Sequence, residues 1–352
     1  MPPPCRGRRL RRPSLLGGLC LALCALAANA GARPSLQLAA KEALLVDTDT
    51  GTTLFALHPN REVPIASTTK LMTAYVTLEF ETLSQIVVER PYDADDGADQ
   101  SLAGLPVGAH YSIADMLRAM LLPSGNDVAH SLALDVGGTR RHFLALMNAA
   151  ARKLGLTHTH YTTPVGLDTA GNYSSADDLE TLAVALMRDP FFAAVVRERS
   201  AYLPHGIEVN NTNDLLAYDF IVGIKTGHTL DAGYCLVGAA SRDGVHLISV
   251  VLGDPSEAAR DDDTLTLLRY GLHLYDTRRT ARKSGAYHHR PASARTPPTP
   301  ARDHAHALPS PSRLQIALLF VLASATTAFV GGCSLRSMRR RATEASRPRA
   351  RA

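Results

Sequence analysis

The chain has 352 residues, of which 45% are apolar and 20% charged, which excludes a collagen-like or wholly disordered protein. The net charge of +4 is divided unevenly: residues 1–13 carry +5 and residues 278–352 carry +13, which leaves −14 for residues 14–277. Because a nucleic-acid-binding surface needs positive charge on the folded part of the chain, we expect no nucleic-acid partner.

The N-terminal end predicts a secretory signal peptide over residues 1–30. An arginine-rich stretch at residues 6–12 precedes an apolar run from Leu15 to Ala28. The triplet Ala28-Asn29-Ala30 then offers the small residues that signal peptidases require. The alternative is an uncleaved N-terminal anchor.

Residues 35–277 form the predicted globular domain. Two apolar runs joined by the turn Thr48-Asp49-Thr50-Gly51 predict a hairpin over Glu42–Asp47 and Thr52–Leu57. Helical patterns follow, and are expected from Ser67 onward, from Ser112 to Leu122, and over Asn126–Val136, Arg140–Leu154, Ala176–Met187 and Phe191–Arg197.

The hydrophobic period then changes to that of strands, which are expected at Ala201–Leu203, Ile207–Val209, Ile221–Lys225, Gly233–Ala240 and His246–Leu252. A last helix is expected over Asp262–Tyr275. A hairpin, a block of helices, a block of strands and a closing helix predict an α+β fold: an antiparallel sheet with helices on it, plus a mostly helical subdomain.

The C-terminal end predicts a membrane anchor. Residues 278–313 are rich in Pro, Arg and His without apolar periodicity, and are expected to be a disordered linker with no metal site. Residues 314–333 carry no charge, and a helix of that length spans about 30 Å. The basic tail 334–352 should be cytoplasmic by the positive-inside rule, which puts the globular domain on the outer face of the cell membrane.

Three short motifs carry the predicted chemistry: Ser67-Thr68-Thr69-Lys70, Ser124-Gly125-Asn126 and Lys225-Thr226-Gly227. Each is weak alone. However, they fall at a helix start, between two helices and at a strand end, in that order. Ser67 and Lys70 share one helix face, so a neutral Lys70 could take the proton of the Ser67 hydroxyl. Burial and a nearby second cation, Lys225, would lower the pKa of Lys70 as this role requires.

The other motif residues suit supporting roles. Ser124 could relay a proton to the leaving amine, and Asn126 could hold Lys70 and the substrate amide. The strand that carries Lys225 could pair with an extended substrate backbone, and Gly227 would leave room for its close approach.

With their surroundings, the motifs resemble the D-alanyl-D-alanine carboxypeptidases, the low-molecular-mass penicillin-binding proteins of the β-lactamase/transpeptidase-like fold. The resemblance extends over residues 40–275 and is carried by residues 64–74, 122–127, 166–168, 173–176, 211–216, 223–229 and 232–234. One departure is Val165, where many relatives have His.

The resemblance implies a serine peptidase that removes the terminal D-alanine from peptidoglycan pentapeptide stems through an acyl-enzyme on Ser67, and that penicillins acylate. It implies catalytic roles for Ser67, Lys70 and Ser124 and a substrate-binding role for Asn126. It also implies that Lys225 and Thr226 meet the substrate carboxylate, and that the N–H groups of Ser67 and His228 form the oxyanion hole beside Gly227. No cofactor is expected.

Three alternatives remain at this point. A D,D-endopeptidase acting on cross-links would use the same residues. A β-lactamase would need a deacylating glutamate, but the usual Glu-x-x-Leu-Asn string does not occur, and Glu180 and Glu198 fall in ordinary helix patterns. A non-enzymatic wall-binding protein would be favoured by the loss of a motif residue, and all are present. For His228, a role as general base is the rival to a wall residue.

Overall fold

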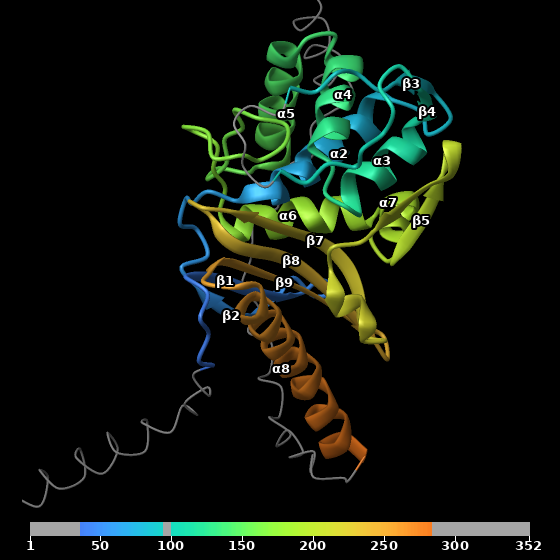
Figure 1. The fold of residues 1–352 in the computed structure, drawn as a ribbon. Helices are drawn as coiled ribbons and strands as arrows, with labels where there is room; N and C mark the ends of the chain where they lie inside the picture. Colours follow the sequence, from blue (N-terminus) through green and yellow to red (C-terminus); the bar gives the residue numbers. More distant parts are fainter. Residues whose placement is uncertain (1–35, 94–99, 284–352) are drawn as a thin grey trace, which may run out of the picture. The chain divides into compact units, whose positions relative to one another are not determined.

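The computed structural model describes residues 36–93 and 100–283 (Figure 1). The predicted signal peptide (1–30), membrane segment (314–333) and tail (334–352) lie outside the described residues, as does the linker from residue 284 onward. Within the described part of the chain, no helix is long and apolar enough to cross a membrane.

A five-stranded antiparallel sheet forms the centre of the fold, with strand order β2-β1-β9-β8-β7. Its strands are β1 (Glu42–Asp47), β2 (Thr52–Leu57), β7 (Ile221–Thr229), β8 (Gly233–Arg242) and β9 (Val245–Asp254). The N-terminal hairpin therefore joins a sheet whose other three strands lie some 170 residues later in the chain, and β1 pairs directly with β9. The predicted α+β class is confirmed.

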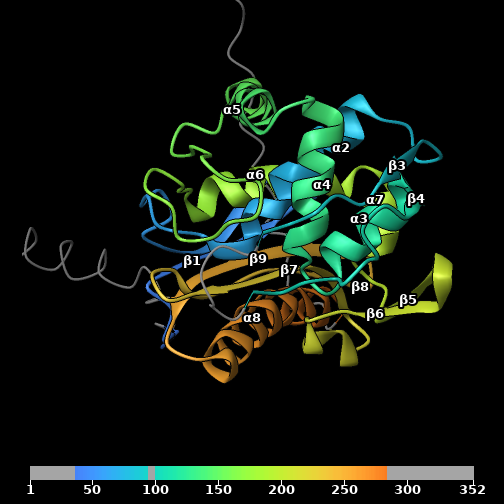
Figure 2. The same ribbon diagram turned by 45° about the horizontal axis from the view of Figure 1, so that its top comes forward.

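Each face of the sheet buries its own hydrophobic core. On β9, Ile248, Val250 and Leu252 belong to the larger core with the helical subdomain, whereas Leu247 and Val251 belong to the smaller core with α8 (Glu257–Lys283). This alternation follows from the period-two geometry of a strand. Figures 1 and 2 show α8 on one side of the sheet and the other helices opposite it.

The helical subdomain contains the helices that the sequence predicts. They are α2 (Lys70–Phe80), α3 (Ile113–Leu121), α4 (Asn126–Gly137), α5 (Arg140–Leu154), α6 (Ala176–Met187) and α7 (Pro190–Val195). Ser112 caps α3, because its Oγ accepts a hydrogen bond from the Asp115 backbone amide at 3.1 Å.

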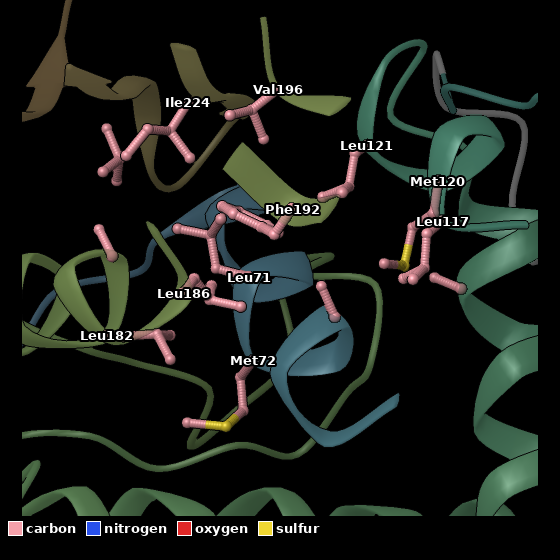
Figure 3. Close-up of a cluster of buried hydrophobic side chains, with 14 of the residues drawn as sticks. Leu71, Met72, Leu117, Met120, Leu121, Leu182, Leu186, Phe192, Val196 and Ile224 are labelled. Atoms are coloured by element: carbon pink, nitrogen blue, oxygen red, sulfur yellow. The ribbon is translucent and has the colours of Figure 1, made fainter. Parts of the chain in front are cut away.

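The start of α2 is held in the middle of the larger core. Leu71 and Met72 are fully buried, and Figure 3 shows Leu71 beside Leu186 of α6 and Phe192 of α7. The Leu71 side chain, which follows Lys70, is therefore fixed by packing from two neighbouring helices, which limits movement at the start of α2.

Some predicted boundaries are wrong. Helix α8 extends from Glu257 to Lys283, so residues 278–283 of the predicted linker are helical. Two short two-stranded sheets flank the helical subdomain. The sequence did not predict the first, which pairs β3 (Ile86–Val88) with β4 (His110–Ser112). The second pairs β5 (Ser200–Leu203) with β6 (Ile207–Asn210), close to the predicted strands. Helix α7 ends at Val195, so Glu198 lies beyond it.

Candidate active site

The first motif forms a tight turn that leads into α2. Ala66–Thr69 is a 3-10 turn (η1), and the α-helix begins at Lys70. Ser67 is partly exposed at this turn, and Lys70, three residues on, is fully buried. The Nζ atom of Lys70 lies 2.8 Å from the Oγ atom of Ser67, as the i, i+3 spacing predicts.

The amine of Lys70 has three hydrogen-bond partners. Besides Ser67 Oγ, it donates to Asn126 Oδ1 at 2.7 Å and to the carbonyl oxygen of Val165 at 2.8 Å. The Asn126 side-chain oxygen and the Val165 carbonyl oxygen can only accept hydrogen bonds. A neutral amine would therefore donate its two N–H groups to them, and its lone pair would face the Ser67 hydroxyl.

Burial lowers the pKa of Lys70 well below its ordinary value. The charge of Lys225 lowers it further, and the charge of Asp127 opposes both effects. A buried amine with a lowered pKa, 2.8 Å from a hydroxyl, is suited to general-base activation of a serine.

The second motif lies between α3 and α4. Asn126 is the first residue of α4, and it contacts Lys70 through Oδ1. Ser124 adopts a left-handed backbone conformation with φ of 65°, and its Oγ atom is buried without a hydrogen-bond partner among the described residues. Its hydroxyl is not committed to the fold.

The third motif lies within strand β7, which extends beyond the predicted end at Lys225 to Thr229. Burial, and next the charge of Arg260, lower the pKa of Lys225 to about 7. Its Nζ donates to the carbonyl oxygen of Thr226 at 3.0 Å, and the Thr226 hydroxyl lies 2.6 Å from that of Thr212.

Gly227 lies directly against the turn Ala66–Thr69, which carries Ser67 and is called the nucleophile turn after the role predicted for Ser67. A Cβ atom at this position would be 3.0 Å from the amide nitrogen of Ser67 and 3.2 Å from that of Thr68. Only glycine lets the strand come this close without displacing the turn. His228 is exposed, and its ring stacks on that of Tyr234 with centroids 4.0 Å apart, which fits a wall residue better than a general base.

Three further residues near the site, Val165, Gly166 and Asp168, have contacts that the motifs do not predict. One partner of Lys70 is the backbone carbonyl of Val165, so this contact does not depend on the Val165 side chain. Gly166 has φ of +92°, and a Cβ there would collide with the carbonyl oxygen of Ala66. Asp168 accepts hydrogen bonds from Thr229 Oγ1 at 2.6 Å and from the Asp231 amide at 3.0 Å, which ties this loop to the β7–β8 turn.

These loop residues also border a cleft. An open cleft of about 380 Å³ lies between the nucleophile turn and this loop, and Ala66, Gly166, Asp168 and Asp231 are among the residues that line it. The Gly-Leu-Asp string at residues 166–168 was the one sequence signal that could have pointed to this part of the site.

The comparison with known families agrees with this geometry. A family model for D-alanyl-D-alanine carboxypeptidases, peptidase family S11, matches residues 27–256. The chain belongs to the D-alanyl-D-alanine carboxypeptidase family.

Curated relatives include the D-alanyl-D-alanine carboxypeptidase of Streptomyces sp. K15. It is 33% identical over 268 residues, which cover 70% of this chain and 91% of the relative. The carboxypeptidase DacA of Haemophilus influenzae is 32% identical over 254 residues, which cover 69% of this chain and 64% of the relative. The match to DacA therefore spans less than two thirds of that relative's length.

Solved structures of the family have the same fold. The Streptomyces K15 DD-transpeptidase superposes with a TM-score of 0.65 at 33% identity, over 68% of this chain and 100% of that one. Penicillin-binding protein D2 from Listeria monocytogenes, in its ampicillin-bound form, superposes with a TM-score of 0.62 at 32% identity, over 68% of this chain and 100% of that one.

Proposed function

We propose that the chain is a serine-type D-Ala-D-Ala carboxypeptidase that removes the terminal D-alanine from peptidoglycan pentapeptide stems and is acylated by penicillins. The observation that carries the proposal is the amine of Lys70, which is buried, has a lowered pKa and lies 2.8 Å from the Ser67 hydroxyl. Family membership and the names of the relatives support the same substrate class.

Acylation uses the residues around Ser67. The Ser67 hydroxyl gives its proton to the neutral amine of Lys70 while Oγ attacks the carbonyl carbon between the two D-alanines. The oxygen of the tetrahedral intermediate faces the amides of Ser67 and His228, which act as the oxyanion hole. The carbon–nitrogen bond then breaks, and the proton passes from Lys70 through the Ser124 hydroxyl to the amine of the departing D-alanine.

Deacylation returns the site to its starting state. Water attacks the ester carbon, its proton passes to Lys70, and the shortened stem leaves as Ser67 Oγ takes the proton back. During acylation, Lys225 and Thr226 hold the terminal carboxylate of the substrate by charge-assisted hydrogen bonds, and this carboxylate leaves with the released D-alanine. A penicillin follows the first step alone, because its ring opens without releasing a leaving group from the site.

Two other enzyme functions share the main site residues. A β-lactamase would need a glutamate free to activate water, whereas the Glu198 carboxylate accepts from Arg118 Nε at 3.0 Å. A D,D-endopeptidase remains the second candidate because it uses the same residues on cross-linked peptides.

We further propose that the catalytic domain lies on the outer face of the cytoplasmic membrane and is anchored by one C-terminal helix. The support is the charge-free stretch 314–333 followed by four arginines at positions 336 and 339–341, together with the signal-like residues 1–30.

The test is covalent labelling followed by product analysis. The full-length protein should gain the mass of one fluorescent penicillin on Ser67, and should convert a muropeptide pentapeptide to a tetrapeptide plus D-alanine. Ser67→Ala should abolish both. Peptide mapping that finds the label elsewhere would overturn the assignment of the nucleophile, and cleavage of cross-linked dimers in preference to pentapeptides would favour the endopeptidase.

A further inference from the structure

A segment from another part of the chain, Gln100–Gly104, lies along the start of α4 and forms a wall beside Asn126. Two hydrogen bonds join it to Asn126, the residue that contacts Lys70. The backbone amide of Asn126 donates to the carbonyl oxygen of Ser101 at 2.9 Å, and the side-chain Nδ2 of Asn126 donates to Gln100 Oε1 at 3.2 Å. Because Oδ1 and Nδ2 belong to one rigid amide group, a shift of this segment rotates the oxygen that faces Lys70.

The next residue, Asp127, holds the same segment with its carboxylate. Its Oδ1 accepts from the Ala103 amide at 3.0 Å, and its Oδ2 accepts from the Gly104 amide at 2.9 Å. Asp127 is 7% exposed, so both bonds form away from bulk water. Hydrogen bonds to an ionised acceptor are about twice as strong as neutral ones.

There is little room between the motif loop and this segment. A Cβ atom on Gly125 would lie 2.9 Å from Ala103 Cβ, 2.9 Å from Asp127 Oδ1 and 2.8 Å from the carbonyl oxygen of Ala119. The loop, the segment and the carboxylate are therefore packed as one unit, and movement of one displaces the others.

The charge of Asp127 faces titratable groups on two other elements. On α2, it favours the protonated form of Lys70, against the effects of burial and Lys225. In the loop after β3, burial and next the charge of Asp127 raise the pKa of Glu89 to about 7. Loss of the Asp127 charge would therefore lower the pKa of Lys70, and would also lower that of Glu89.

We propose that Asp127 is a positioning residue, whose carboxylate fixes the Gln100–Gly104 wall and thereby holds Asn126 in place against Lys70. The proposal rests on the proposed serine-peptidase function.

Asp127 could also have a purely structural role, because an acidic side chain in the first turn of a helix interacts favourably with the helix dipole. In keeping with that role, Asp127 Oδ1 accepts a hydrogen bond from the Val128 backbone amide at 3.0 Å. A purely structural role of that kind would change stability without changing the pH dependence of acylation.

Two substitutions separate geometry from charge. Asp127→Asn keeps the size of the side chain but loses the charge and one of the acceptor oxygens. Asp127→Glu keeps the charge but displaces it by one methylene. The matched control is Asp135→Asn, which removes a carboxylate from the same helix; Asp135 pairs with Arg90 at 3.6 Å and has no role in the wall.

The measurements use the full-length chain in detergent. They are the second-order rate of acylation by a fluorescent penicillin as a function of pH, thermal unfolding, and amide hydrogen exchange at Ala103 and Gly104. Asp127→Asn should slow acylation by about tenfold or more, since misplacement of a reacting group by about 1 Å can cost about a hundredfold. It should also move the acidic limb of the pH profile to lower pH, because a Lys70 of lower pKa stays neutral there.

The other variants have distinct expectations. Asp127→Glu should slow acylation with the acidic limb unmoved, and should stand in for Asp127→Asn if that variant fails to fold. Both variants should exchange the Ala103 and Gly104 amides faster than the wild type, and Asp135→Asn should change none of the three measurements apart from a small effect on unfolding.

The proposal is overturned if Asp127→Asn acylates at the wild-type rate with the wild-type pH profile. It is also overturned if Ala103 and Gly104 keep their protection, or if Asp135→Asn slows acylation equally. A wild-type protein that neither binds penicillin nor cleaves the pentapeptide would instead overturn the proposed function. Hydrogen exchange at Ala103 and Gly104 would then decide by itself whether the Asp127 carboxylate fixes the Gln100–Gly104 wall.

Discussion

Gly227→Ala is the sharpest test of the oxyanion hole, because the added atom would press on the nucleophile turn itself. The new Cβ would lie 3.0 Å from the Ser67 nitrogen, 3.1 Å from Ala66 Cβ and 3.2 Å from the Thr68 nitrogen. These neighbours are backbone and Cβ atoms, which cannot rotate away. Either β7 or the turn must therefore move by a few tenths of an ångström. The new methyl group would also lie against the Ser67 backbone amide and hinder its hydrogen bond to the substrate oxygen.

The expected loss follows from the role of that amide. Removal of one oxyanion-hole donor costs about 10²- to 10³-fold in rate, or about 2.7–4 kcal/mol of transition-state stabilisation. Overpacking alone costs about 1–3 kcal/mol of folding stability. Gly227→Ala should therefore slow acylation by about 10²-fold or more while the protein stays folded at room temperature, provided that it has an ordinary stability of about 5–15 kcal/mol.

The matched control is Gly238→Ala in the neighbouring strand β8. A Cβ there would lie 2.9 Å from Thr264 Cγ2 and 3.0 Å from Ser249 Oγ, which is similar crowding on the face that packs against α8. The assay is stopped-flow acylation by a fluorescent penicillin, with thermal unfolding of each variant. Gly238→Ala should lose stability but keep the wild-type acylation rate. Equal acylation by Gly227→Ala and the wild type would refute the reasoning.

Three further predictions concern charge, stability and topology. Lys225→Ala should lower kcat/KM by about 10- to 150-fold for a peptide with a free terminal carboxylate, and much less for its amidated analogue; an equal loss on both would assign Lys225 to the proton relay instead. Burial raises the pKa of the Glu89 carboxyl from 4.5 to about 7, so the folded state loses stability as the pH rises between these values. Glu89→Gln should therefore raise the free energy of unfolding relative to the wild type more at pH 8 than at pH 4, by up to about 3 kcal/mol, and an equal difference at both pH values would contradict this. Protease added to intact protoplasts should release the catalytic domain by cleavage between residues 284 and 313, and protection of the domain until lysis would reverse the proposed orientation.

Much of the local structure could be predicted from the sequence. The boundaries of α5 and α6 match the prediction, because each begins at a side-chain cap and carries a helical hydrophobic pattern. The contact between Ser67 and Lys70 also follows from their spacing alone. Such features depend on residues within a few positions of one another.

Predictions failed where the local signal was weak. Strands β3 and β4 have three residues each, which is too short for a periodic pattern to show. The last turns of α8 are polar and rich in arginine, so the sequence suggested that the helix ends near Tyr275, although these residues have no strong preference against a helix.

The sequence by itself determined the spacing that brings Ser67 beside Lys70, most of the helical and strand segments, and the separation of an acidic domain from basic ends. Only the tertiary structure decided what surrounds them. The Val165 carbonyl that binds Lys70 lies 95 residues away in the chain, and the close approach of Gly227 to Ser67 depends on the pairing of β7 with β8. The same holds for the lowered pKa of Lys70, because desolvation is a property of the assembled core. Backbone geometry and capping act over a few residues, whereas burial and long-range hydrogen bonds exist only once distant segments have packed together.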